Sequence, residues 1–279
     1  MGTGADILAM IERIDAGLAL PRVRSVWIPE PTLAADKDAE FGVIALEDGS
    51  VGLFYAWLGE SQAGISARYD AAALAGQPAI ALARRFAGAD DIERSIGLAA
   101  INAITQSLFS QAGYEPPPAA NSMAGLNLEA GDHLGLIGYF PSLVRQAGAL
   151  GVRTTVIERK HHLVRESGDC VVTLDPLRLA DCNKVICTAA TLINDTIDDM
   201  LAYCAGVEVI AVLGPSASFP PEPLFERGVS IVGGSRIDDA GAAIAMQQSG
   251  SGLRACSRRY VIERSSWPGT AALLARAAA

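Results

Sequence analysis

The second half of the chain alternates short Val/Ile/Leu-rich runs with helical patterns, and this rhythm limits the fold more than any other feature. Apolar runs of strand length that take turns with helices predict a parallel sheet with right-handed crossovers. The predicted strands are 133–139, 153–157, 184–188, 208–213 and 230–232. The predicted helices are 141–150, 192–204, 224–227 and 238–248. We therefore expect a Rossmann-like α/β domain.

The first half has a different pattern. Apolar residues from Ile7 to Leu18 recur at helical spacing, and a candidate strand follows at 23–28. Two β-rich runs, 41–46 and 51–57, flank Asp48-Gly49, which predicts a hairpin. Helical patterns follow at 79–86 and 91–110. We expect a smaller α+β domain over residues 1–88 with antiparallel strands, and a second domain over residues 89–279.

The helix predicted at 91–110 is apolar on all sides, which is typical of a helix buried on every face. We expect it to link the two domains and to lie between them. Asn102 would then stand in an apolar setting and would need hydrogen-bond partners. Three consecutive prolines, Pro116 to Pro118, end this part of the chain and read as a linker.

Ligands of open parallel sheets bind beyond the carboxyl ends of the strands. A turn that contains small, hydroxyl, amide or acidic residues follows every predicted strand, and the residues of these turns are our candidates. They are Gly138, Tyr139, Phe140, Pro141, Glu158, Thr188, Thr191, Asn194, Asp195, Thr196, Gly214, Pro215, Ser216 and Gly233-Gly234-Ser235. Such residues also serve as ordinary turns and helix caps. Because polar or small residues occur in all five loops, we expect a ligand site at the carboxyl edge of the sheet. We include Asn102 of the helix predicted at 91–110 among its candidate residues.

The identity of the ligand stays open on the residues alone. Gly135 to Gly138 does not match the dinucleotide fingerprint, so a standard NAD site is not expected. Glu158 follows Gly138 by 20 residues, where nucleoside-binding sheets place the acid that holds ribose, although it is equally a solvated surface residue. His161, His162, Glu158 and Cys170 could ligate a transition metal, but their spacing matches no zinc motif. No Ser-His-Asp order or G-x-S-x-G elbow occurs.

Charge and cysteine content narrow the partners. The formal net charge is −9, and no Lys/Arg cluster interleaves with aromatic residues, so we expect no nucleic-acid binding. The five cysteines are odd in number and form no CxxC, which favours reduced thiols and a cytoplasmic location. Charged residues interrupt the first 20 positions, so we expect no signal peptide there, and we expect no membrane span.

Six stretches occur in the order of a known family. They are 95–103, 135–141, 156–158, 188–196, 214–216 and 233–234. With them the chain resembles the putative heavy-metal chelation family, in which a Rossmann-like domain follows an enolase N-terminal-like domain. The resemblance implies a site in the cleft between the two domains. Asp195 departs from the pattern, because the family usually has glycine between Asn194 and Thr196.

Three functions remain after these observations. The leading hypothesis is binding or chelation of a metal, or of a small metal-chelating molecule, in the interdomain cleft. The alternative is an enzyme that uses a nucleoside cofactor such as S-adenosylmethionine on a small-molecule substrate in the same cleft. A third is an interaction protein whose loops are only structural. The buried helix and acidic surface are also compatible with a homodimer.

Overall fold

The computed structural model describes residues 2–29, 41–56, 61–121, 123, 125–250 and 252–279. Its larger sheet has eight strands in the order β11-β10-β9-β8-β4-β5-β7-β6. The six inner strands are parallel, and the edge strands β11 and β6 are antiparallel to their neighbours. The strands are β4 His133–Ile137, β5 Arg153–Ile157, β6 Arg165–Ser167, β7 Cys170–Thr173, β8 Lys184–Thr188, β9 Val209–Leu213, β10 Ile231–Ile237 and β11 Ser257–Glu263.

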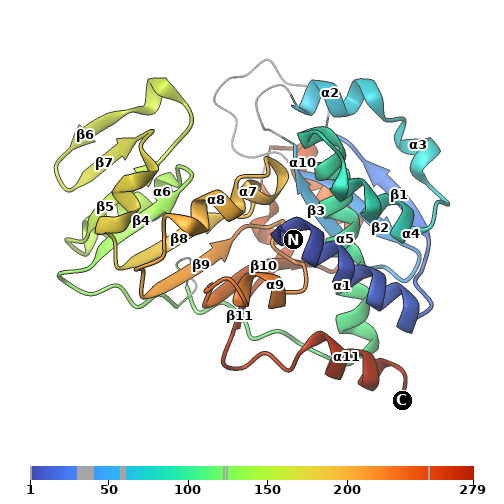
Figure 1. Cartoon of the computed structure of the whole chain (residues 1–279). Helices are drawn as coiled ribbons and strands as arrows, with labels where there is room; N and C mark the ends of the chain where they lie inside the picture. Colours follow the sequence, from blue (N-terminus) through green and yellow to red (C-terminus); the bar gives the residue numbers. More distant parts are fainter. Residues whose placement is uncertain (1, 30–40, 57–60, 122, 124, 251) are drawn as a thin grey trace.

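Helices cover both faces of this sheet (Figure 1). Leu134 and Leu136 of β4 pack with α6 (Pro141–Ala149) in one cluster, whereas Ile137 belongs to the cluster on the other face. That second cluster includes residues of α7 (Ala190–Ile193), α8 (Ile197–Ala202) and α9 (Glu222–Phe225). Side chains alternate between the two faces along each strand, so strands covered on both faces read as continuous apolar runs.

The predicted parallel sheet is confirmed, with differences at its ends. Strands 153–157 and 184–188 occur as predicted. The strand predicted to reach Tyr139 ends at Ile137, because Gly138 has a φ of +95°, outside the β region. Strands β6 and β7, which form a short hairpin that turns at Gly168, were not predicted. Strand β11, which follows α10 (Ala240–Gln248) and pairs antiparallel with β10, was not predicted either.

The smaller sheet is antiparallel, in the order β1 (Val23–Trp27), β2 (Phe41–Leu46), β3 (Val51–Tyr55). The predicted hairpin is confirmed: β2 pairs with β3 around Gly49, whose φ is +89°. All six residues of β2 are buried, because the sheet lies between α5 (Asp91–Gln111) on one face and α10 on the other. The fold class is therefore a mixed α/β structure with a large, mostly parallel sheet and a small antiparallel one.

Helix α5 is buried from Ser95 to Phe109, as its all-round apolar pattern predicts. It begins at Asp90, whose side chain accepts a hydrogen bond from Glu93 N. It lies so close to β3 that a Cβ on Gly52 would stand 1.9 Å from the carbonyl oxygen of Ala99. Glycine at this position therefore allows the helix and the strand to approach at backbone distance.

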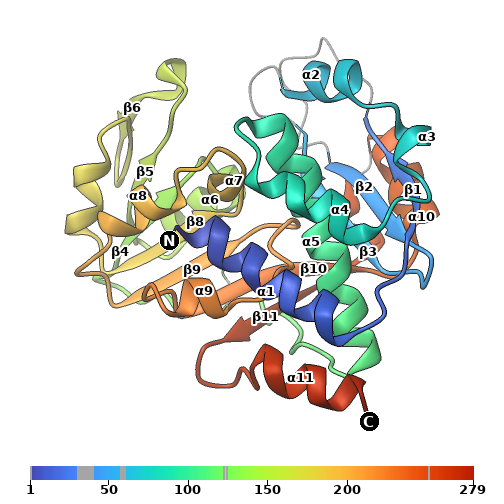
Figure 2. The same cartoon turned by 45° about the vertical axis from the view of Figure 1, so that its right-hand side comes forward.

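Elements from both halves of the sequence pack together around α5. The remaining helices are α1 Thr3–Gly17, α2 Ser61–Arg68, α3 Ala71–Leu74, α4 Ala79–Ala83 and α11 Thr270–Ala277. Figure 2 shows α1, α4 and α11 beside α5, and α11 contacts both α5 and α1. On the small sheet, Phe41 N donates to Gln247 Oε1 of α10 at 2.8 Å. The division at residues 88 and 89 stays a prediction.

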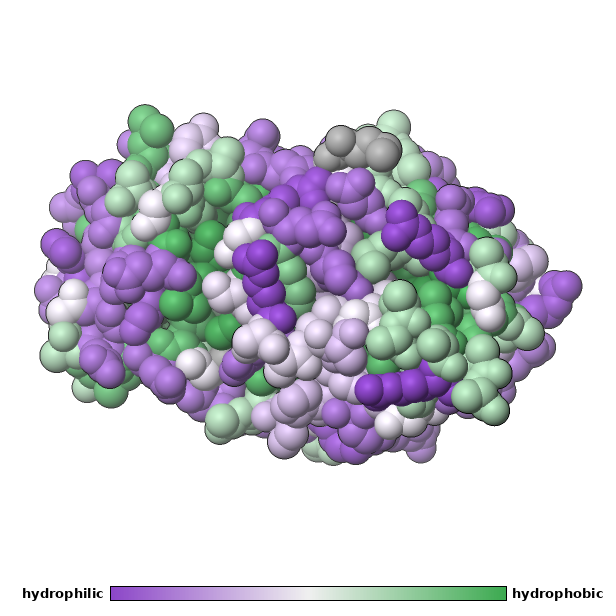
Figure 3. Space-filling view, turned by 60° about the horizontal axis from the view of Figure 1, so that its bottom comes forward, coloured by the Kyte–Doolittle hydropathy of each residue, from purple (hydrophilic) through white to green (hydrophobic). Residues whose placement is uncertain are grey.

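The surface contains separate apolar areas. Figure 3 shows two hydrophobic areas on one face, with a hydrophilic band between them. The exposed large hydrophobic residues among those described are Leu150, Val164, Leu174, Leu177 and Tyr203. Within the described residues, no helix is both long and apolar enough to cross a lipid bilayer. The homodimer stays a prediction.

A charged network at the amino end of the parallel strands makes stability depend on pH. Burial alone would raise the pKa of Asp132, but hydrogen bonds from Lys184, Glu129 N and Asn183 outweigh it and lower this pKa to about 2. The folded-state pKa lies below its usual value of 3.8. This contribution to folding is therefore complete above pH 4 and is lost as the pH falls towards 2.

We predict that Lys184→Met lowers the free energy of unfolding at pH 7 by up to about 2 kcal/mol and flattens the decline between pH 4 and pH 2. Urea unfolding at a series of pH values measures both effects. Arg84→Met is the control, because the Arg84–Glu12 pair is about half exposed and should contribute less than about 0.5 kcal/mol. An unchanged slope in Lys184→Met would contradict the assignment to Asp132.

Candidate functional site

The carboxyl ends of the parallel strands form one rim, where most of the predicted site residues lie. The rim is built from the turns after β4, β5, β8 and β9. Partly exposed members are Gly138, Tyr139, Phe140, Glu158, Thr188, Asn194, Thr196, Gly214 and Pro215, while Pro141 and Asp195 are exposed. These residues are open to a ligand.

The prediction that Gly233, Gly234 and Ser235 form a loop at the rim is wrong. They lie inside β10, which continues to Ile237, rather than in a loop after it. A Cβ on Gly234 would lie 2.5 Å from the carbonyl oxygen of Ala217. The glycine therefore serves close packing of the turn after β9.

The chain reverses its direction across the sheet between β4 and β8. From β4 it proceeds to β5 and β7 on one side, and from β8 it proceeds to β9 and β10 on the other. Such a reversal opens a crevice at the strand ends, which is the usual ligand position in open α/β sheets. Gly138 and Thr188 meet here: a Cβ on Gly138 would lie 3.0 Å from Thr188 Cγ2.

Glu158 is tied to the backbone of the rim. One carboxylate oxygen accepts hydrogen bonds from Arg159 N (2.7 Å) and Lys160 N (3.2 Å), and the other accepts from Tyr139 N (3.2 Å). These bonds fix the turns after β4 and β5 to each other. They also use much of the accepting capacity of the carboxylate.

The side chain of Arg159 spans the end of β4. Arg159 follows β5 and Asn194 follows β8, and β4 lies between these two strands in the sheet. With the Asn194 side-chain oxygen turned towards Arg159, Nη1 of Arg159 lies 3.1 Å from it, and the Asn194 nitrogen donates to the Thr191 carbonyl. A guanidinium group therefore stands at the reversal point.

The small sheet reaches the same rim through Tyr55, at the end of β3. The Tyr55 ring packs against Phe41 with 5.6 Å between ring centroids. Burial, and secondarily the negative charge of Glu158, raise the pKa of the Tyr55 hydroxyl. The hydroxyl therefore stays protonated at neutral pH and close enough to Glu158 to sense its charge.

Asn102 has the partners that its predicted burial requires. Its fully buried amide donates to the carbonyls of Leu53 (2.9 Å) and Ser216 (2.8 Å), and its oxygen accepts from Ser218 N (3.1 Å). One side chain thus joins β3 of the small sheet to the turn after β9. Asn102 positions the rim instead of lying open on it.

Thr191 and Ser216 are also buried. Thr191 Oγ1 donates to the Thr188 carbonyl at 2.7 Å and so closes the turn after β8. The role expected for these two residues as direct ligand contacts stays a prediction. Their positions indicate that they shape the rim.

The helix predicted over 192–204 is interrupted. The structure has α7, then Asn194 to Thr196 as a turn, then α8. Asp195 has a φ of +56°, in the left-handed region that favours glycine and tolerates Asp and Asn. This backbone geometry explains how glycine can stand at this position in the resembled family.

The histidine and cysteine residues do not form the metal cluster considered from sequence. No group of three His, Cys, Asp or Glu side chains suited to a metal occurs in the described part of the chain. His161 and His162 are exposed in a short 3₁₀ turn. Burial raises the pKa of Cys182 and of Cys204 to about 11, which disfavours the thiolate that metals bind.

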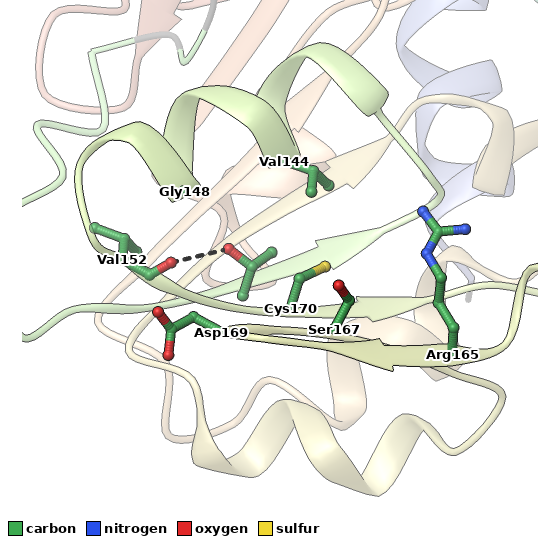
Figure 4. A pocket seen from close by; sticks show the side chains of 8 residues that line it. Val144, Gly148, Val152, Arg165, Ser167, Asp169 and Cys170 are labelled. Carbon is green, nitrogen blue, oxygen red and sulfur yellow. Dashed lines mark hydrogen bonds between the residues drawn. The ribbon is translucent and has the colours of Figure 1, made fainter.

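Two hollows lie outside the reversal point. One, of about 280 Å³, lies between α6 and the β6–β7 hairpin and is lined by Val144, Gly148, Val152, Thr154, Arg165, Ser167, Asp169 and Cys170 (Figure 4). It borders the rim, because the Arg165 guanidinium lies 5.1 Å from the centroid of the Tyr139 ring. The other, of about 440 Å³, lies beside β1 and is lined by Val26, Trp27, Ile28, Ser66, Tyr69, Asp70 and Ala71. We favour the reversal point over both, since the polar turns converge there.

Sequence reasoning missed Tyr55, Arg159 and Ser95. Arg159 could have been noticed as the neighbour of Glu158, whereas Tyr55 has no signal apart from its position at a strand end. Ser95 is fully buried on α5, and its hydroxyl has no hydrogen-bond partner among the residues that the structure describes. A buried polar group without a partner is costly and needs an explanation.

Comparison with known proteins gives two family matches. A model of a family described as "Putative heavy-metal chelation" matches residues 121–265, and a second model with the same description matches residues 39–105. An uncharacterized protein of Methanocaldococcus jannaschii is 23% identical over 180 residues, which cover 62% of this chain and 67% of that protein.

Two solved structures from the family of the first model share the fold. A protein of unknown function from Pyrococcus horikoshii has a TM-score of 0.65 and 18% identity, covering 92% of this chain and 99% of its own. One from Desulfitobacterium hafniense has a TM-score of 0.60 and 21% identity, covering 92% and 98%. At these identities the likeness establishes the fold alone.

We predict that Asp195→Ala lowers the free energy of unfolding by about 1 kcal/mol, because alanine tolerates the left-handed conformation less well than Asp. Asp195→Gly should leave it unchanged or raise it, since glycine adopts this φ without strain. Urea unfolding of both variants provides the measurement. Equal losses in both would mean that the carboxylate, and not the backbone, determines stability here.

We predict that Ser95→Ala leaves the stability of the ligand-free protein unchanged or raises it by up to about 1 kcal/mol, because it removes an unpaired buried hydroxyl. Ser107→Ala on the same helix is the matched control. Ser107 Oγ donates to Asp48 Oδ2 at 2.6 Å, so this variant should lose about 1 kcal/mol or more. A clear loss in Ser95→Ala would show that its hydroxyl has a partner.

Proposed function

Because the chain belongs to the family described as "Putative heavy-metal chelation", we propose that it holds a metal, together with a small metal-chelating molecule, at the rim between β4 and β8. The proposed site faces Tyr55 of the small sheet, in a cleft between the two halves of the chain. The reversal of chain direction at β4 and β8 is the observation that carries this proposal.

The supply of metal ligands supports a chelating molecule over a bare ion. Glu158 and Asp195 bring carboxylates to the rim, but the described residues gather no set of three His, Cys, Asp or Glu. Glu158 is also engaged by three backbone amides. A metal bound here would therefore take its remaining ligands from the small molecule, with hydroxyl and carbonyl oxygens of the rim as the protein's own contribution.

A nucleoside cofactor such as S-adenosylmethionine is the second candidate, and one observation favours it. Glu158 follows β5, directly beside the glycine turn of β4, which is where dinucleotide-binding sheets place the acid for ribose hydroxyls. Against it, the bonds from Tyr139, Arg159 and Lys160 direct this carboxylate to its own loop. The chain would then be an enzyme acting on a small molecule in the same cleft.

We predict that Ni²⁺–citrate stabilises the full chain, and that Glu158→Ala and Asn194→Ala each weaken its binding about tenfold or more. Metal analysis of the purified protein, thermal-shift screening and calorimetric titration measure this. A ligand at 100 times its dissociation constant adds about 2.7 kcal/mol. Glu208→Ala is the matched control, since Glu208 is exposed before β9, at the opposite edge of the sheet.

Unchanged affinity in both site variants would remove Glu158 and Asn194 from the site. Stabilisation by S-adenosylmethionine, with none by Ni²⁺ or by Ni²⁺–citrate, would overturn chelation in favour of the second candidate.

A further inference from the structure

The rim between β4 and β8 presents hydrogen-bond donors, among them the guanidinium group of Arg159, beside the carboxylates of Glu158 and Asp195. We infer that its ligand carries an oxyanion, a carboxylate or a phosphate, bound by the guanidinium of Arg159. This inference rests on the proposed function, from which it takes the position of the ligand. It adds the chemical class of the group that binds there. Its starting observation is that the Arg159 side chain spans the end of β4 and contacts Asn194.

Arg159 is exposed, and its partner differs in kind from those of three partly buried arginines of the chain. Arg94 pairs with Asp91, Arg227 with Asp6, and Arg236 with Glu115. Arg159 has no carboxylate partner among the described residues and contacts a neutral amide oxygen instead. The chain has a net charge of −9, so acidic partners are abundant elsewhere. Because the amide oxygen accepts from only one nitrogen of the guanidinium group, the other N–H groups can donate to a planar oxyanion.

The carboxylate of Glu158 is engaged by the backbone of the rim. Both oxygens of Glu158 accept hydrogen bonds from backbone N–H groups of Tyr139, Arg159 and Lys160. Much of its hydrogen-bonding capacity is therefore used within the turns after β4 and β5. A bare cation would have to compete with these three amides, whereas an oxyanion can use Arg159 without breaking them.

Two hydroxyls from the first half add donors at the same place. Tyr55 stays protonated beside Glu158, because burial and that charge raise its pKa. The position of Ser95 follows from the alignment of α5 with β3. Ser107 bonds Asp48 and Asn102 bonds Leu53, so the two elements run antiparallel.

Extending that alignment by two helical turns brings Ser95 beside the end of β3. Residues seven apart share a face of a helix, so Ser95 lies on the face that carries Asn102. The neighbouring Arg94 donates to the carbonyl of Ile193 in α7, which places this part of α5 against the turn after β8. The buried hydroxyl, which has no partner in the described part of the chain, thus lies close to the rim, and a ligand oxygen would satisfy it.

The test titrates the full chain with citrate, inorganic phosphate, Ni²⁺ and Ni²⁺–citrate by calorimetry. We expect citrate or phosphate to bind with and without metal, and Arg159→Gln to weaken that binding at least tenfold. Arg159→Lys should recover part of the affinity, since it restores charge but not the planar fork. Arg264→Gln is the control: it removes the same charge at the opposite edge of the sheet, after β11, and should bind like the unmodified chain.

The outcomes separate this inference from the proposed function. Binding of Ni²⁺ alone, with no binding of citrate or phosphate, would overturn the oxyanion and keep a metal site. Equal affinity of Arg159→Gln and Arg264→Gln for citrate and phosphate would overturn the role of Arg159. Tight binding of citrate and phosphate with no added affinity for Ni²⁺–citrate would keep the oxyanion and contradict chelation. No binding of any oxyanion probe would overturn the inference.

Discussion

The buried amide of Asn102 is the interaction on which the arrangement of the rim depends. It binds the carbonyls of Leu53 and Ser216 and the N–H of Ser218, and so connects the small sheet, the central helix α5 and the turn after β9. Leaving such buried groups unpaired costs about 1–3 kcal/mol each. No apolar side chain could replace these contacts, so Asn102 ties the small sheet to the turn after β9. The packing of α5 and α10 on the small sheet acts in the same direction.

Two residues with positive φ also shape the rim. Gly138 ends β4 with a positive φ and lets Thr188 approach, while Asp195 adopts a left-handed conformation and separates α7 from α8. Asn194 ends α7, with its N–H bonded to the carbonyl of Ala190, and its side chain meets Arg159. The left-handed residue that follows turns the chain before α8 begins.

The polar groups of the rim differ in whether they have hydrogen-bond partners inside the protein. Thr191, Asn102 and Glu158 spend their hydrogen bonds on the protein itself. Arg159, Ser95 and the hydroxyl of Tyr55 are less fully engaged, and they are donors at neutral pH. The unused hydrogen-bonding groups at the rim are thus donors, which favours a ligand that accepts hydrogen bonds. A chelating molecule that carries its own metal ligands, as we propose, would be such a ligand.

The sequence by itself determined the parallel sheet, the hairpin around Gly49 and the buried helix 91–110, because each depends on local periodicity and turn chemistry. It also identified the strand-end turns, since a parallel sheet brings those turns to one edge. Only the tertiary structure decided that α10 covers the small sheet, that β6 and β7 form an edge hairpin, and that Arg159 reaches Asn194. These contacts join residues far apart in the chain, and short or mixed segments such as Arg165–Ser167 have no periodic signal of their own. Their partners become defined only when the whole core has formed.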